Sequence, residues 1–125
     1  MTGSRIPALA FTADVVAVVV FAAVGRAGHD ESADVLGLLV TAAPFGVGLA
    51  AAWVTPLVRA RPAGLRAGLI ALVSTAGVGL LLRFAFLGRL PLSFVIVATC
   101  ALGVLLLGWR GLSALVAHRV AHRVR

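Results

Sequence analysis

The sequence predicts an all-α integral membrane protein whose four transmembrane helices form one bundle. Of its 125 residues, 62% are hydrophobic and only 12% are charged. Soluble domains average roughly 45–50% apolar and about 25% charged residues, so this chain has too little polar surface to enclose a water-soluble core. The apolar residues also fall into four blocks, each close to the ~20 residues that cross the hydrocarbon layer as a helix.

The four predicted helices cover residues 6–24, 35–54, 67–87 and 92–109 of a single domain, 1–125. Pro7 lies in the first turn of the first helix, where a missing N–H is tolerated. Because this block also contains Asp14, we expect a retained helix and not a cleaved signal peptide. Pro44 lies inside the second block and predicts a kink there. Residues 110–125 are expected to form a basic cytoplasmic tail.

The arginine residues predict the orientation in the membrane. Eight of the eleven lie in the N-terminal segment, the link 55–66 and the tail, whereas Arg26, Arg83 and Arg89 lie on the opposite side. The positive-inside rule therefore predicts a multi-pass protein of the inner (cytoplasmic) membrane with both termini in the cytoplasm. The same topology places Trp53, Trp109 and Arg110 at the cytoplasmic interface, where indoles are enriched.

The basic residues also indicate which partners to expect. They lie at the ends of apolar blocks and not on one face, so we expect no nucleic-acid partner. In a helical tail, His118 and His122 are spaced to share a metal ion, but neighbouring Arg residues oppose a cation. We therefore expect anionic lipids at the cytoplasmic face, and neither a metal nor a cofactor.

Small residues predict close helix packing. Ala42, Gly46 and Ala50 form one small-residue face, and Gly64 and Gly68 form another. Such faces allow helix backbones to approach closely. We expect them to pack within the bundle, with a subunit interface as the alternative.

Asp14 is the main candidate for chemistry, because a carboxylate inside a membrane helix must be paired, wetted or protonated. At 1.5 Å per residue it lies roughly 12 Å from the cytoplasmic end of its helix. Ser74 and Thr75 come to a similar depth, and Thr99 lies slightly further out. Arg110 is predicted to be ~10 Å or more away in depth. Ion- or proton-binding candidates are therefore Asp14, Ser74, Thr75 and Thr99, with Thr12 or water as further partners of the carboxylate; a structural polar tie between helices is the alternative.

The opposite side of the membrane carries a second set of polar candidates. Arg26, His29 and Arg83 are expected to shape the outer mouth of a pathway, although a solvated loop equally explains His29 and the acids beside it. No nucleophile elbow or zinc-binding motif occurs, and no pair of carboxylates shares one helix face, so we do not expect an enzyme.

Several residue strings resemble the small membrane-protein family known as domain of unknown function 3054. They are FAAVGRAGH at 21–29, AAPFG at 42–46, GLLLR at 79–83, and SFVIVAT at 93–99 followed by GWR at 108–110. The resemblance covers residues 14–110 and implies a four-helix integral membrane protein without an established activity. It singles out these motif positions: Asp14, Arg26, His29, Pro44, Arg83, Trp109 and Arg110.

Two functions follow from these features. The first is a small transporter or channel for an ion or small solute, built as a homo-oligomer and using Asp14. The alternative is a non-catalytic accessory subunit or assembly factor of a larger membrane complex, docked through its small-residue faces and basic tail.

Overall fold

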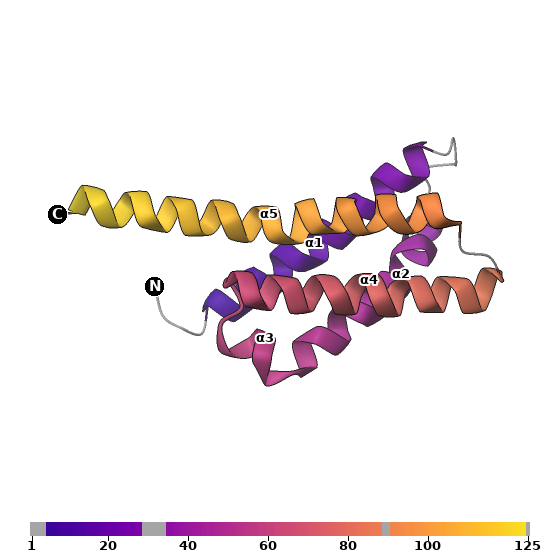
Figure 1. Ribbon diagram of the computed structural model, residues 1–125, viewed down its shortest axis with the longest axis horizontal. Coiled ribbons are helices and arrows are strands. Elements are labelled where there is room, and N and C mark those ends of the chain that lie inside the picture. Colours follow the sequence, from indigo (N-terminus) through magenta and orange to yellow (C-terminus); the bar gives the residue numbers. More distant parts are fainter. Residues whose placement is uncertain (1–4, 29–34, 89–90, 125) are drawn as a thin grey trace.

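The computed structural model describes residues 5–28, 35–88 and 91–124, and this part of the chain is helical without strands. The helices are α1 (Arg5–Gly28), α2 (Val35–Val54), α3 (Pro56–Ala60), α4 (Leu65–Leu87) and α5 (Leu92–Val124). The four long helices form one bundle, in which α1 and α2 run obliquely to α4 and α5 (Figure 1). The predicted all-α bundle is confirmed.

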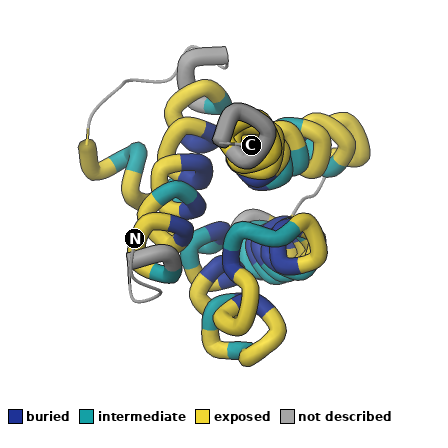
Figure 2. The backbone as a smooth tube through the Cα atoms, turned by 90° about the vertical axis from the view of Figure 1, so that its left-hand side faces the viewer, coloured by how far each residue is buried: buried dark blue, intermediate teal, exposed yellow. Residues whose placement is uncertain are grey.

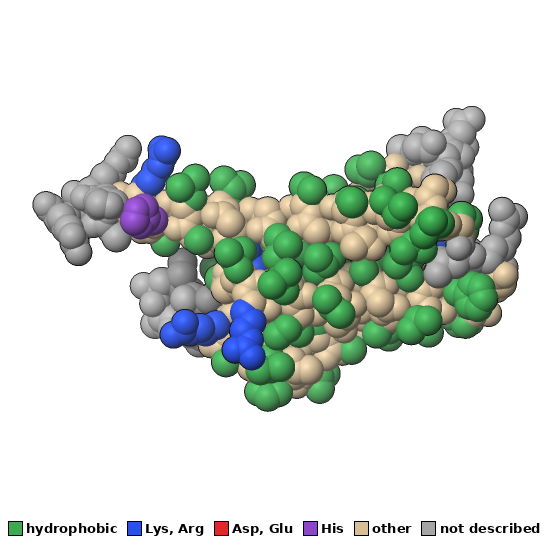
Figure 3. All heavy atoms as spheres, viewed as in Figure 1, with side chains coloured by type: hydrophobic (Ala, Val, Ile, Leu, Met, Phe, Trp, Pro, Cys, Tyr) green, Lys and Arg blue, Asp and Glu red, His purple; other side chains and the backbone are tan. Residues whose placement is uncertain are grey.

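All four long helices could cross a membrane. The segments that are long and apolar enough are Pro7–Gly25, Val35–Val54, Leu65–Phe86 and Leu92–Val120. Their outward surface is apolar as well, since many large hydrophobic side chains on them are exposed (Figure 3). A helical bundle that is apolar both inside and outside is typical of a multi-pass membrane protein. Which terminus faces the cytoplasm stays a prediction.

Two segments differ from the expected boundaries. The fourth helix does not end at residue 109 but continues without a break to Val124, so that α5 is about 50 Å long. Its last turns, beyond Arg110, project past the rest of the bundle (Figure 1). The link 55–66 is also not a plain loop, because it contains α3, which begins at Pro56 in a position where proline favours helix initiation.

α2 and α4 approach each other closely at Gly48. A Cβ atom on Gly48 would lie 2.5 Å from the carbonyl oxygen of Ser74 and 2.8 Å from the Cα of Thr75. The Ser74 hydroxyl donates a hydrogen bond of 2.6 Å to the Gly48 carbonyl, which ties the two helices at the same point. Glycine is therefore required here for the backbones to touch.

Gly46, in contrast, does not make the contact expected of it. A Cβ atom there would meet nothing within 4 Å. Gly48 lies two residues further on and so points to a different side of α2. The small-residue face of Ala42, Gly46 and Ala50 lines an open groove between α1 and α2, and of these three residues Ala42 also packs against the hydrophobic core.

The core lies between the inward faces of the four long helices (Figure 2). The ring of Phe45 is fully buried, packing where Gly79 leaves space, and it meets Phe21 edge to face at 4.9 Å. Leu102 and Leu106 of α5 close the core from the other side, each with no exposed surface. This apolar packing fixes the helices around the polar cluster described next.

Candidate functional site: a buried carboxylate–guanidinium cluster

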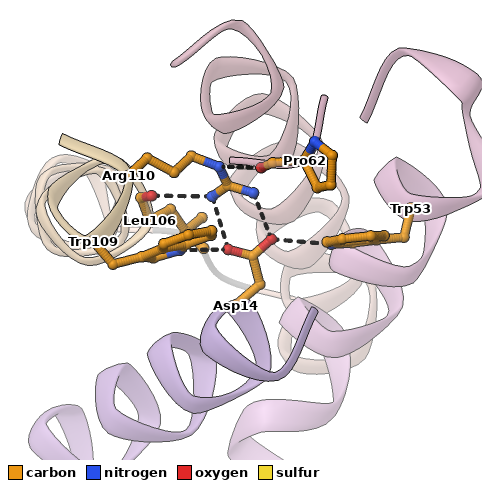
Figure 4. Close-up of polar contacts among 6 residues, drawn as sticks. All are labelled: Asp14, Trp53, Pro62, Leu106, Trp109 and Arg110. Carbon is orange, nitrogen blue, oxygen red and sulfur yellow. Dashed lines mark hydrogen bonds and ion pairs between the residues drawn. The ribbon is translucent and has the colours of Figure 1, made fainter. Parts of the chain in front are cut away.

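A buried polar cluster joins the helices at the end of the bundle nearest α3. It consists of Asp14 from α1, Trp53 from α2, and Trp109 and Arg110 from α5, with the carbonyl of Pro62 from the link before α4 (Figure 4). Asp14 and Arg110 have no exposed surface. The cluster therefore buries opposite charges from α1 and α5 within a predominantly apolar interior.

The carboxylate of Asp14 accepts four hydrogen bonds, two on each oxygen. Oδ1 accepts from Nε1 of Trp109 and NH1 of Arg110, each at 2.8 Å. Oδ2 accepts from Nε1 of Trp53 at 3.0 Å and from NH2 of Arg110 at 2.8 Å. The Arg110 contact is the bidentate arrangement in which a planar guanidinium matches a carboxylate best.

Arg110 is held by the backbone as well as by Asp14. Its Nε donates to the carbonyl of Pro62 at 2.9 Å, and NH1 also donates to the carbonyl of Leu106 at 3.0 Å. The guanidinium lies 4.4 Å from the ring centroid of Trp109. The side chain passes directly over Gly68 of α4, where a Cβ atom would come within 2.7 Å of its Cδ. Gly68 thus provides the space through which Arg110 reaches Asp14.

Aromatic packing orients the Trp53 indole. Phe11 and Asp14 lie three residues apart and so share one face of α1. The Phe11 ring meets the Trp53 ring edge to face at 5.3 Å. α1 therefore supplies both the apolar contact that positions the indole and the carboxylate that accepts its N–H.

The hydrogen bonds around Asp14 determine whether its carboxylate can bind a further ligand. Indole and guanidinium groups only donate, so all four bonds to Asp14 require acceptor oxygens, as in an ionised carboxylate. Two oxygens offer about four lone-pair positions, and all four are occupied. In this arrangement the carboxylate has no acceptor position left for a proton or a cation. Among the described residues, no group of three His, Cys, Asp or Glu side chains could hold a metal ion.

The expected partners of Asp14 are wrong, because the structure joins it to Arg110 and two tryptophans. Ser74 donates to Gly48 instead, and the Thr12 hydroxyl donates to the carbonyl of Ala8 within α1. Thr75 is buried in the helix contact, and its hydroxyl has no hydrogen-bond partner among the described residues. Thr99 is exposed on the outer side of α5.

The expected separation of Asp14 from Arg110 fails for two physical reasons. The prediction counted depth along helices standing upright from a common plane, whereas α1 crosses the bundle obliquely (Figure 1). It also left the link 55–66 outside the bundle. Val58 and Pro62 in this link are buried, so the link covers the end of the bundle and encloses the guanidinium.

The other residues predicted to have a functional role, where the structure describes them, lie at both ends of the bundle. Trp53, Trp109 and Arg110, predicted to share one interface, lie together around Asp14. Arg83 lies towards the opposite end of α4, half-buried, with its guanidinium 4.6 Å from the ring centroid of Phe94. His29 and the side chain of Arg26 lie outside the described residues.

Two groups that help to form the cluster, Gly68 and the Pro62 carbonyl, could hardly be predicted from the sequence. The sequence indicates Gly68 only as part of a small-residue face. It does not indicate that this glycine leaves space for an arginine side chain of a neighbouring helix. The Pro62 carbonyl is a backbone group, so no residue type could have identified it.

Each indole is expected to contribute measurably to stability. Replacing Trp109 by Phe keeps an aromatic ring but removes the N–H that Oδ1 of Asp14 accepts, and Trp53→Phe does the same at Oδ2. Hydrogen bonds to charged groups contribute about 1.5–3 kcal/mol, so each variant should lose free energy of unfolding in that range. Detergent unfolding followed by circular dichroism would measure it. In an Asp14→Leu background the same substitutions should have little effect; an equal loss there would show that ring packing, not the N–H, is responsible.

Comparison with known proteins identifies a family but no activity. A family model described as "Protein of unknown function (DUF3054)" matches residues 11–113, which include every side chain of the cluster. No curated protein and no solved structure matches the chain.

Proposed function

Because the chain belongs to the DUF3054 family of proteins of unknown function, its role has to be argued from its own structure, and we propose that it is a non-catalytic accessory subunit of a larger membrane complex. The observation that carries this proposal is the fully bonded state of Asp14. A carboxylate that accepts four fixed donors acts as a tie between helices, since exchanging an ion would require breaking several of those bonds.

The apolar core supports the same conclusion. Away from the cluster, the buried side chains between the helices are predominantly apolar, including Phe45, Leu49, Leu80 and Leu102. An ion or polar solute needs polar groups or water along its route to replace its hydration. The described helices thus enclose a packed core in place of a polar pathway.

The groove between α1 and α2 provides a docking surface for a partner. It has a volume of about 360 Å³ and is lined by apolar side chains together with the small-residue face of Ala42, Gly46 and Ala50. In lipid, helices associate through close van der Waals packing at such small residues. A transmembrane helix of another subunit is the proposed occupant.

The test is purification of the tagged protein from its own host in native lipid, followed by intact-mass analysis, with a matched pair of variants. Gly46→Leu fills the groove, whereas Gly77→Leu adds the same side chain to an exposed position of α4 where a Cβ atom also meets nothing within 4 Å. We expect a stoichiometric partner with the native protein and with Gly77→Leu, and its loss with Gly46→Leu.

A different result would favour the transport alternative. In that case the protein would purify as a homo-oligomer without a partner, and reconstituted vesicles would show an ion flux that Asp14→Asn abolishes while the fold is retained. That combination would contradict the accessory role directly.

A further inference from the structure

We infer that the end of the molecule around α3 is a binding surface for anionic phospholipid headgroups. This basic end is formed by Arg59, Arg61, Arg66 and Arg119, all of them exposed. Arg59 and Arg61 lie in and directly after α3, and Arg66 lies in the first turn of α4. On the face shown in Figure 3, cationic side chains gather at the end of the molecule from which α5 projects. The inference does not depend on the accessory role proposed above.

No acidic side chain of the described chain neutralises this end. Asp14 is the one acid among the described side chains, and its oxygens are occupied inside the cluster. The other three acids of the sequence, Asp30, Glu31 and Asp34, follow α1 and precede α2 in the chain and lie outside the described residues. Among the described residues, the positive charge of this end is therefore not matched by a free acidic side chain.

Exposed apolar side chains alternate with the arginines at the same end. Leu57 of α3 and Leu65 of α4 are 54% and 56% exposed, and Leu112 and Val116 on the projecting part of α5 are 64% and 56% exposed. Water is a poor solvent for such a surface, whereas the boundary between acyl chains and headgroups accommodates apolar and cationic side chains together.

Charge complementarity indicates which molecule binds the basic end. A second copy of the chain would place like charges opposite one another, which opposes association through this surface. A layer of lipid phosphates instead offers the planar anionic groups that guanidinium binds well, next to acyl chains for the leucines and valines. Anionic lipid therefore satisfies both parts of the surface.

The experiment compares phosphatidylglycerol with phosphatidylcholine of the same acyl chains, bound to the full-length protein in neutral detergent and counted by native mass spectrometry. Each Arg near an anionic surface contributes roughly a fivefold preference. Three such contributions multiply to roughly a hundredfold, so the variant Arg59→Gln/Arg61→Gln/Arg66→Gln should lower the preference for phosphatidylglycerol by about tenfold to a hundredfold. The matched control, Arg83→Gln, removes one arginine from the other end of α4 and should leave the preference unchanged.

Two further measurements keep the test decisive if the triple variant folds poorly. Lysine at the same three positions should preserve most of the preference, since the charge remains. Raising the salt concentration from about 0.05 to about 0.5 M should weaken the preference of the native protein, because exposed charges are screened. Equal retention of the two lipids, a preference that survives the triple Gln substitution, or insensitivity to salt would each overturn the inference.

Discussion

Asp14→Asn is expected to lower the free energy of unfolding by about 3–5 kcal/mol, because it leaves Arg110 buried without its counter-charge. Both residues have no exposed surface, so water cannot take over the lost contacts. The amide group of Asn also donates, and it would face donors from Arg110 and Trp53 at Oδ2. Unfolding by sodium dodecyl sulfate in mixed micelles, followed by indole fluorescence, would measure the loss.

A double-mutant cycle separates the ion pair from simple packing. Arg110→Met alone should cost a similar amount, since it leaves the carboxylate unpaired. Replacing a whole buried pair by apolar residues is far less costly than removing one partner. Asp14→Leu combined with Arg110→Met should therefore lose less than the summed losses of Asp14→Leu alone and Arg110→Met alone, with a coupling energy of about 3 kcal/mol. Additive losses would show that the two charges do not depend on one another.

Gly48→Ala is expected to destabilise the bundle by about 1–3 kcal/mol, because the added methyl group would overlap the backbone of α4. The overlapping atoms are the Ser74 carbonyl oxygen and the Thr75 Cα, and backbone atoms cannot rotate away as a flexible side chain can. The two helices must move apart, which also lengthens the hydrogen bond from Ser74 to the Gly48 carbonyl. Thermal unfolding in detergent would report the change.

Gly46→Ala is the matched control for this substitution. It adds the same methyl group to the same helix two residues away, where nothing lies within 4 Å. Alanine has a higher helix propensity than glycine by about 1 kcal/mol, so this variant should be neutral or slightly stabilised. If both variants lost stability equally, the loss would arise from α2 itself and not from its contact with α4.

The fold was largely predictable because apolar block length dominates in a membrane protein. The interval 35–54 agrees with α2 at both ends, and 67–87 begins two residues inside α4. The continuation of α5 to Val124 was less apparent because Arg110 resembles a helix-ending interfacial arginine. Its burial against Asp14 removes the need for water at that position, so the helix can continue past it.

The sequence indicated most residues of the site, but it did not indicate which of them form hydrogen bonds and ion pairs with one another. An acid such as Asp14 within an apolar helix is a candidate functional residue by itself, and the GWR string indicated Trp109 and Arg110. Which groups meet depends on helix tilt and on the covering link, and neither leaves a periodic signal in the sequence. The polar residues at matching depth, Ser74 and Thr75, face α2 and not Asp14.

The pairing of Asp14 with Arg110 also constrains the order in which the molecule can be completed during synthesis. The two residues are 96 positions apart, so the ribosome delivers the carboxylate long before the guanidinium that neutralises it. Until α5 enters the membrane, α1 carries an uncompensated charge, which is costly in the hydrocarbon layer. A chain that lacks α5 is therefore expected to be less stable in the bilayer than a chain that contains it. The carboxylate of Asp14 gains its counter-charge only when α5 joins the bundle.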